Sequence, residues 1–280
     1  MTEPALTLDQ ALREAQQQGL ERLDAQLLLL HALGRDAHDR AWLIAHDQHR
    51  MHAAEASRFA SLVQHRRDGQ PVAYLLGERE FFGLRLQVDA RVLDPRPDTE
   101  TLVEWALSHL PSEADARVLD LGTGSGAIAL AVQHARPRAE VWAVDASAEA
   151  LTVAGANAQR LGLPLHLRHG HWFAPVTGRF DLILSNPPYL AEGDPHLAAL
   201  QHEPRQALVA GADGLDDLRH IVQAAPAHLR PGAWLLLEHG HDQAVAVRAL
   251  LAGAGFGQVQ SRADLAGIAR CSGGRWPTVE

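Results

Sequence analysis

The chain has 280 residues, and its 25 basic and 34 acidic residues give a formal net charge of −9 when histidine is neutral. A protein that coats nucleic acid gains most of its affinity by releasing counterions from phosphates, so this acidity argues against direct nucleic-acid binding. Every basic residue is arginine, and the absence of lysine excludes a Schiff base and a Walker-type phosphate loop.

Length and apolar content indicate two globular domains. A typical domain of roughly 150 residues gives about two for this length, and 46% apolar residues suffice for both cores. No segment approaches the ~20 apolar residues of a membrane span, and the opening residues lack a signal pattern. We therefore expect a cytoplasmic protein without a membrane partner. Its one cysteine, Cys271, has no partner for an intrachain disulfide.

Residues 1–74 have the pattern of a small helical bundle. Thr7 and Gln10 fit a capping box at the start of a first helix, and Gly19 suits its end. Further helices are expected over residues 24–33, 40–45 and 53–68. We therefore expect an N-terminal helical domain.

Residues 75–95 are expected to form a β-hairpin connector. Apolar residues alternate with others and then recur further on, which predicts a pair of strands. These apolar residues are Phe82, Leu84, Leu86 and Val88, followed by Val92 and Leu93. The proline-rich segment 94–97 then ends the hairpin.

Residues 96–280 alternate short apolar runs with helical stretches, the signature of a parallel sheet covered by helices. Strands are expected over residues 117–121, 141–144, 165–167, 180–185, 233–238 and 256–261, with a last extended piece at 268–271. The predicted fold class is α/β, with a Rossmann-like, mostly parallel, seven-stranded sheet.

A glycine-rich loop, Gly122-Thr123-Gly124-Ser125-Gly126, follows the first of these strands. Glycines at this turn let the backbone approach a ligand closely, and the next helix offers free N–H groups. The spacing differs from the dinucleotide fingerprint, which favours a cofactor without a pyrophosphate. Asp145 ends the next strand, where a carboxylate accepts both hydroxyls of a ribose. Together these features predict S-adenosylmethionine as the cofactor.

The tetrapeptide Asn186-Pro187-Pro188-Tyr189 directly follows the strand at 180–185. In an open α/β sheet this position faces the glycine-rich loop across the ligand crevice. The prolines fix the backbone, so the Asn186 side-chain oxygen and the Pro187 carbonyl aim at one spot. Two such acceptors match the two N–H bonds of a planar NH₂ group.

A planar amide or aromatic amine is a poor nucleophile because its lone pair is delocalised. Accepting both hydrogens returns electron density to the nitrogen and points its lone pair at a methyl donor. Tyr189 is expected to stack on the planar group. The ring faces of Tyr189 and Trp172 are expected to attract a sulfonium, for ~0.5–2 kcal/mol.

These motifs resemble the release-factor glutamine methyltransferase family, of the PrmC/HemK type. The resemblance rests on Asp-Leu-Gly-Thr-Gly-Ser-Gly at 120–126, Asn-Pro-Pro-Tyr at 186–189, Pro-Arg-Pro-Asp-Thr-Glu at 95–100 and Arg-Glu-Phe-Phe-Gly at 79–83. It extends to residues 194–197, 210–215 and 236–240, and so covers nearly the whole chain. The resemblance implies a class I methyltransferase domain over residues 96–280 and a substrate-binding role for residues 1–74.

The resemblance also implies a reaction, a partner and site residues. The reaction is methylation of the side-chain N5 of glutamine in the Gly-Gly-Gln motif of class I peptide chain release factors. By position, the catalytic residues are Asn186, Pro187 and Tyr189, and residues 186–189 bind the target glutamine. The cofactor contacts are Gly122, Thr123, Gly124, Ser125, Gly126, Asp145, Trp172 and Asn186.

The sequence departs from the family pattern at two places. His171 stands where family members often carry an acid before the Trp-Phe pair, so an adenine contact there is open. The segment 197–203 is short and lacks an expected Gly-Asp-Val-Arg element, which leaves release-factor contacts there open.

Three other functions stay open from the residues alone. A nucleic-acid amino-methyltransferase uses a similar loop on a flipped base, and a ribosomal-protein glutamine methyltransferase uses the same chemistry. A cofactor-binding module without catalysis would tolerate the loss of Asn186, so the intact tetrapeptide at 186–189 argues against it. The 17 histidines do not form a pattern typical of zinc, so no metal is expected. The oligomeric state is left open.

Overall fold

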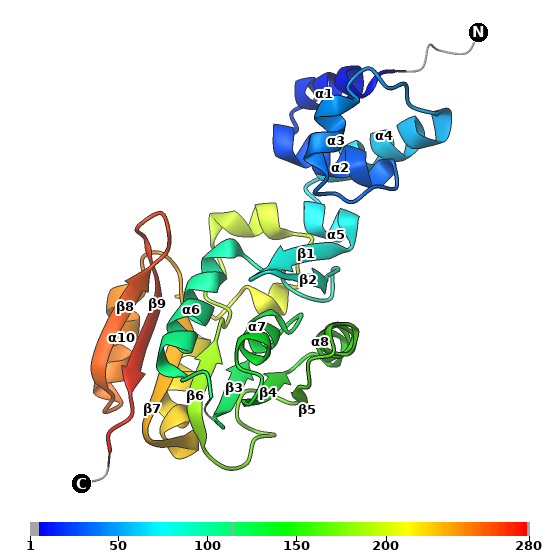
Figure 1. Cartoon of the computed structure of the whole chain (residues 1–280). Coiled ribbons are helices and arrows are strands. Elements are labelled where there is room, and N and C mark those ends of the chain that lie inside the picture. The colour runs from blue at the N-terminus through cyan, green and yellow to red at the C-terminus, as the bar shows by residue number, and fades with distance from the viewer. Residues whose placement is uncertain (1–5, 114, 279–280) are drawn as a thin grey trace. The chain divides into compact units, whose positions relative to one another are not determined.

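The computed structural model of the chain describes residues 6–113 and 115–278 (Figure 1). The chain divides into two compact units, Met1–Glu78 and Arg79–Glu280. The boundary between them falls within the segment for which the sequence predicts a connector.

The first unit is helical, as the sequence predicts. Its helices are α1 (Leu8–Gln17), α2 (Arg22–Ala32), α3 (Arg40–Ala45), α4 (Ala53–Arg67) and α5 (Val72–Leu76). The predicted capping box is present, because the Thr7 hydroxyl accepts from the Gln10 amide at 3.2 Å and the Gln10 side chain accepts from the Thr7 amide at 2.9 Å. The five-residue helix α5 was not predicted, since it is too short to show a helical period.

The hairpin lies earlier in the chain than the sequence pattern indicates. Its strands are β1 (Glu78–Phe81) and β2 (Leu84–Gln87), so the expected strand starting at Phe82 and the expected strand at Val92 and Leu93 are wrong. Phe82 and Gly83 form the turn instead, with φ of 50° and 77°. Such a pair of left-handed residues closes a two-residue hairpin, and Gly83 adopts this conformation without strain.

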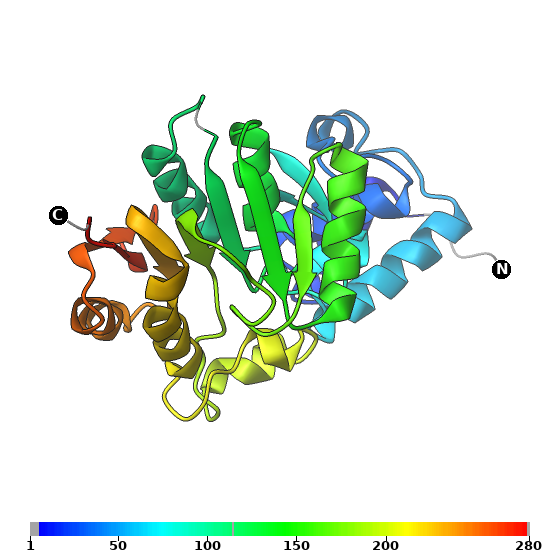
Figure 2. The same ribbon diagram turned by 90° about the horizontal axis from the view of Figure 1, so that it is seen from below.

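The second unit contains a seven-stranded sheet in the order β5-β4-β3-β6-β7-β9-β8. The strands are β3 (Arg117–Leu121), β4 (Glu140–Asp145), β5 (His166–His169), β6 (Phe180–Ser185), β7 (Leu229–Glu238), β8 (Gly257–Ala263) and β9 (Ala269–Arg275). The helices are α6 (Glu100–His109), α7 (Ala127–Ala135), α8 (Ala148–Leu161), α9 (Asp216–Ala224) and α10 (Ala244–Gly253). Strands β3 to β7 run parallel, and β9 is antiparallel to both of its neighbours. The predicted mostly parallel, seven-stranded α/β fold is therefore confirmed (Figure 2).

The strand order reverses direction at β3. From β3 the chain continues outward to β4 and β5, then returns to place β6 on the other side of β3. Ends of neighbouring strands lie level, because Leu121 pairs with Ser185 and Ser185 pairs with Leu237. In such sheets ligands bind in the crevice at the carboxyl ends where the order reverses. The fold therefore places the glycine-rich loop and the segment after β6 at one edge.

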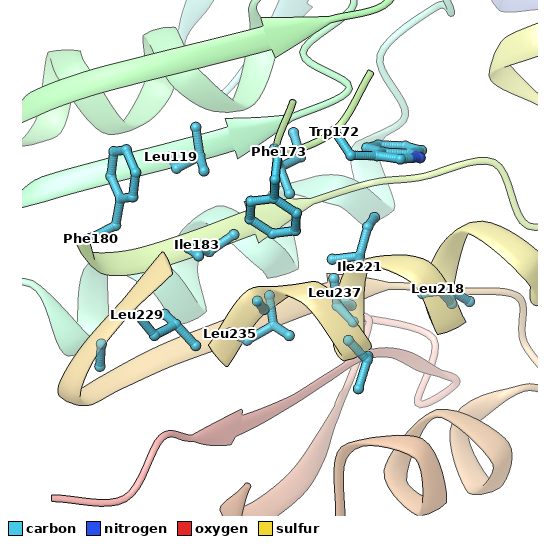
Figure 3. Packing of buried hydrophobic residues seen from close by; sticks show 14 of the residues in the cluster. Leu119, Trp172, Phe173, Phe180, Ile183, Leu218, Ile221, Leu229, Leu235 and Leu237 are labelled. Carbon is cyan, nitrogen blue, oxygen red and sulfur yellow. The ribbon is translucent and has the colours of Figure 1, made fainter. Parts of the chain in front are cut away.

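Two apolar layers cover the sheet. On one face, Leu119, Ile183 and Leu235 pack with α9, α10 and the segment that carries Trp172 and Phe173 (Figure 3). On the other face α6 packs on α7, β6 and β7. The Trp234 ring of β7 lies on this face, 6.3 Å from the Trp105 ring of α6, and alternate residues of β7 such as Leu236 point the same way.

Gly273 of β9 permits the close approach of α6 to the sheet. A Cβ at this position would lie 2.5 Å from a methyl of Leu236, 2.7 Å from the Leu235 carbonyl and 3.0 Å from the Trp105 ring. These groups are buried and have no room to move. The packing on this face therefore requires glycine at residue 273.

We expect Gly273→Ala to lower the free energy of unfolding in urea by roughly 2–4 kcal/mol, because the methyl overpacks a closed core. Gly257→Ala in β8 is the matched control, since a Cβ there meets only the Arg275 carbonyl at 3.9 Å. Equal stability of the two variants would contradict the assigned packing.

Candidate active site

A cavity of about 240 Å³ opens at the carboxyl ends of β3, β4 and β6, in the second unit. Six of the residues predicted from the sequence line it: Gly122, Gly124, Asp145, Trp172, Asn186 and Pro188. The fold thus brings together the glycine-rich loop, the acid after the second strand and the Asn-Pro-Pro segment. Their roles toward a ligand stay predictions.

The glycine-rich loop folds back against the end of β4. The amides of Gly122 and Thr123 both donate to the Val144 carbonyl, at 2.9 and 3.0 Å. Gly122 has φ of 72°, and a Cβ there would lie 3.3 Å from the Trp172 ring. Glycine at 122 therefore allows both the turn and the close approach of the indole.

The remaining predicted loop residues, Thr123, Ser125 and Gly126, are buried and do not contribute to the cavity lining. The Thr123 hydroxyl donates to Asp120 at 2.6 Å, and the Ser125 carbonyl accepts from the Asn157 side chain at 3.0 Å. Gly126 forms the N-cap of α7 with φ of 84°. These residues fix the shape of the loop rather than face the cavity.

Asp145 connects the loop to the start of α8. One carboxylate oxygen accepts from the Gly124 amide at 2.9 Å, and the other accepts from the Ser147 amide at 2.8 Å. A carboxylate oxygen has two lone-pair sites, so each oxygen keeps acceptor capacity toward the cavity. The carboxylate is therefore oriented by the backbone and still able to bind hydroxyl groups.

Trp172 is held in an uncommon backbone conformation. Its φ is 47°, which is rare for a bulky residue and marks local strain. The indole is 8% exposed, and its Nε1 donates to Asp217 at 3.2 Å. Burial raises the pKa of Asp217, and the hydrogen bond from Trp172 partly opposes that shift. Asp217 and His171 also line the cavity, so the departure at His171 lies beside the indole.

Asn186 comes directly after β6 and is oriented from the side of α6. Its Nδ2 donates to the Thr99 hydroxyl at 3.3 Å, and Thr99 is the last residue of a 3₁₀ turn over Pro97–Thr99 that leads into α6. The preceding Ser185 hydroxyl donates to the Leu121 carbonyl at 2.7 Å. Because Nδ2 faces Thr99, Oδ1 lies on the opposite side of the carboxamide.

The segment after Asn186 is anchored by its backbone. Pro187 is buried, and Pro188 lines the cavity. The Tyr189 carbonyl accepts from Gln243 Nε2 at 3.0 Å, and its ring packs against the core without contributing to the cavity lining. Burial and the nearby Glu238 charge raise the pKa of the Tyr189 hydroxyl.

A short bridge holds the other end of this segment. The Leu190 amide donates to the Leu208 carbonyl at 2.8 Å, and the Ala210 amide donates to the Leu190 carbonyl at 2.9 Å. Gly214 follows with φ of 73°, and a Cβ there would lie 2.2 Å from the Tyr189 carbonyl. The diproline corner is therefore fixed at both ends.

Family models match both parts of the chain. Residues 98–260 match a methyltransferase small domain, and residues 7–77 match the PrmC N-terminal domain. The release factor glutamine methyltransferase of Xylella fastidiosa is 51% identical over 271 residues, which are 95% of this chain and 98% of that protein. The protein of that name in Bordetella pertussis is 52% identical over 260 residues, 91% of this chain and 95% of that protein.

The chain belongs to the release factor glutamine methyltransferase family. Among solved structures, a methyltransferase from Pyrococcus furiosus aligns with a TM-score of 0.55 at 20% identity, covering 71% of this chain and 91% of that one. At this identity the likeness concerns the fold, which is that of the methyltransferases.

Several residues of this family member contribute to the site but were not assigned a role from the sequence. Thr99 holds the Asn186 amide, Gln243 holds the Tyr189 carbonyl and Asp217 holds the Trp172 indole. Each comes from a distant segment, so no local pattern reveals the contact. Thr99 lies in one of the segments on which the family resemblance rests, residues 95–100. That resemblance is the only feature of the sequence that pointed to it.

The segment 195–207, whose last residues line the cavity, contains the buried acid Glu203. Residues Pro195–Leu200 form a 3₁₀ helix, and Glu203 behind it pairs with Arg96 and accepts from the Asp94 amide at 3.2 Å. Pro204, Gln206 and Ala207 then line the cavity. Glu203 therefore fixes this wall of the cavity to the proline-rich stretch at 94–97.

Two negative findings apply to residues 6–113 and 115–278. Within these ranges, no three histidine, cysteine or acidic side chains lie close enough to hold a metal ion. No helix in the same ranges has the length and apolar content to cross a bilayer.

Asp120 beneath the glycine-rich loop provides a test of the site's electrostatics. Its side chain is fully buried, and among the described residues Oδ1 has no hydrogen-bond partner. Burial raises the pKa of Asp120 to about 7, against an ordinary value of 3.8. Because the folded pKa lies above the unfolded one, ionisation costs stability as pH rises between about 4 and 7.

We expect Asp120→Asn to be more stable than the unmodified chain at pH 8.5 by about 2–4 kcal/mol, and the difference to shrink toward pH 5. Unfolding free energies at both pH values measure it. Asp115→Asn is the control of opposite sign, because hydrogen bonding from Arg138 lowers the pKa of that exposed acid. The same difference in unfolding free energy at both pH values would contradict the raised pKa of Asp120.

Proposed function

We propose that this chain transfers a methyl group from S-adenosylmethionine to the side-chain N5 of the glutamine in the Gly-Gly-Gln motif of class I release factors. The observation that carries the proposal is the placement of Asn186, whose amide nitrogen is held by Thr99 while the residue lines the same cavity as Asp145. Relatives with about half of their residues identical carry the name of this activity.

The cavity fits the cofactor by its donor and acceptor groups. Asp145 supplies a carboxylate for two ribose hydroxyls, and Trp172 supplies an aromatic ring beside Gly122. Helix α7 begins directly after the glycine-rich loop, and a helix N-terminus favours a carboxylate such as that of the methionine part. When bound, S-adenosylmethionine supplies a methyl group activated by the positive sulfonium.

The chain's part in the reaction is to raise the reactivity of an amide nitrogen. Asn186 Oδ1 and the Pro187 carbonyl accept the two N–H bonds of the target glutamine and orient its lone pair. The new N–CH₃ bond forms as the S–CH₃ bond breaks. The methylated amide is strongly acidic and releases its extra proton to solvent, so the site needs no dedicated base.

We assign substrate binding to the N-terminal helices, residues 1–74, which match the PrmC N-terminal domain. The partner is then a protein rather than a nucleic acid, in keeping with the net charge of −9. Release factors act in the cytoplasm, and we place the enzyme there.

The proposal is tested by a labelled-methyl transfer assay with four substrates offered separately. These are a purified class I release factor, its variant with alanine in place of the motif glutamine, total ribosomal protein and DNA. We expect label on the first substrate alone. Label on DNA or on ribosomal protein in its place would establish one of the rival activities.

Asn186→Ala should lower the single-turnover rate of methyl transfer by about 10² or more, as with the loss of other preorganised hydrogen-bonding groups. Its affinity for S-adenosylmethionine, measured by calorimetry, should change little, because the residue contributes mainly to the glutamine site. Undiminished transfer by this variant would remove Asn186 from the mechanism.

Asp145→Ala should show the reverse pattern. We expect the dissociation constant for S-adenosylmethionine to rise by about 10- to 100-fold, as for other lost hydrogen bonds to a charged group. Asp145→Asn keeps one oxygen acceptor and should fall between the two. Calorimetry gives the three affinities, and identical values would contradict the ribose assignment.

A further inference from the structure

Glu238 ends β7 beside Asn186. Ser185 of β6 pairs with Leu237 of β7, so the next residue on each strand, Asn186 and Glu238, are neighbours at the carboxyl edge of the sheet. The Glu238 residue is only 2% exposed. By strand alternation its side chain points to the face that α6 covers, the same face as the Thr99 hydroxyl.

The carboxylate of Glu238 is engaged by uncharged donors. Burial raises the pKa of Glu238 to about 7, and side-chain hydrogen bonds from Thr99 and Asn186 partly oppose this shift. Within residues 6–113 and 115–278, its Oε2 has no hydrogen-bond partner. The carboxylate is therefore buried with one oxygen unpartnered and with Thr99 and Asn186 beside it.

The charged groups around Glu238 do not neutralise it by contact. Arg270 of β9 lowers the pKa of Glu238 and Asp98 raises it. Arg270 itself pairs with Asp98 at 3.2 Å and with Asp264 at 2.9 Å. The remaining titratable neighbours, Tyr189 and Cys271, both have pKa values raised by burial and by Glu238.

A buried, poorly compensated carboxylate costs stability, and an apolar or amide side chain of similar size would pack at the same place. The fold alone therefore does not account for an acid at this position. Its one distinctive effect falls on its neighbours Thr99 and Asn186, which belong to the site.

We infer that Glu238 is a positioning residue that determines which way the Asn186 carboxamide faces. With Nδ2 toward Thr99 and Glu238, the amide donates toward a hydroxyl oxygen, which can accept, and a carboxylate, which can only accept. A flipped amide would place Oδ1 against the lone pairs of the carboxylate. Glu238 therefore keeps Oδ1 on the cavity side.

This orientation matters because of the proposed function, on which the inference rests. The target glutamine presents two N–H donors, so the cavity side of Asn186 must be an acceptor. A flipped Asn186 would present its own N–H donors to those of the substrate. Glu238 thus acts through Asn186 and touches neither substrate nor cofactor.

Protonation of Glu238 should weaken this control. A neutral carboxyl group has an O–H donor as well as an acceptor, so it accepts either orientation of the amide. The acid form accumulates in the folded protein as pH falls through about 7. The rate of methyl transfer should therefore decrease from pH 8.5 to pH 6.

The test is a double-mutant cycle on the full chain, measured as single-turnover methyl transfer to the release factor from pH 6 to pH 9. Glu238→Gln should lower the rate at pH 8.5 about tenfold and flatten the pH profile, with unchanged affinity for S-adenosylmethionine. In the Asn186→Ala background the same substitution should cause no further loss. Asp115→Asn is the control and should keep the profile, because this exposed acid pairs with Arg138 before the start of β3, away from the carboxyl edge of the sheet.

A readout independent of activity follows the amide itself. The side-chain ¹H–¹⁵N resonances of Asn186, identified by their loss in Asn186→Ala, should shift with pH through about 7 in the unmodified chain and not in Glu238→Gln. The inference would be overturned if the rate losses of Glu238→Gln and Asn186→Ala added in the double variant, or if the Asn186 resonances did not shift with pH. If the unmodified chain methylates no release factor and the resonances still titrate, the proposed function fails and the positioning role stands.

Discussion

The hydrogen bond from the Asn186 amide nitrogen to the Thr99 hydroxyl connects two parts of the second unit that are distant in sequence. One is the carboxyl end of β6, and the other is the 3₁₀ turn that leads into α6. In this arrangement the amide nitrogen of Asn186 faces Thr99 and its Oδ1 lies on the opposite side of the carboxamide. The proposed chemistry depends on this choice, because an amide turned the other way offers donors to a group that is itself a donor.

The same edge of the sheet holds two carboxyl groups at a cost in stability. Asp120 and Glu238 are both buried, each with one unpartnered oxygen within residues 6–113 and 115–278, and burial raises the pKa of both to about 7. Asp120 lies under the glycine-rich loop and Glu238 lies behind Asn186. Strain at Trp172, with φ of 47°, adds to this cost. Unfavourable features thus gather around the cavity, as functional sites commonly show.

The sequence allowed prediction of the helices and strands that have a clear apolar period, and of the site residues that lie together in one motif. Helices α1 to α4 of the first unit and the strands of the sheet were predicted, since their apolar patterns extend over whole elements. The hairpin was misplaced because Phe82 continues the apolar alternation, although it occupies the turn with Gly83. Contacts such as Gln243 to Tyr189 or Trp172 to Asp217 join segments far apart in the chain, and their register was not deducible from either segment.

The Asn-Pro-Pro-Tyr motif is therefore an incomplete description of the site. Prolines restrict the backbone on either side of the Pro187 carbonyl, but they leave the rotation of the Asn186 carboxamide free. Thr99, in the 3₁₀ turn before α6, holds the amide nitrogen, and by our inference Glu238 of β7 sets which way the carboxamide faces. The anchoring of Tyr189 and Leu190 then keeps the corner from moving as a unit. By this inference, a chain with the same four residues but an apolar side chain at position 238 would still bind the cofactor with normal affinity. It would transfer the methyl group slowly, because nothing would hold Oδ1 of Asn186 on the cavity side.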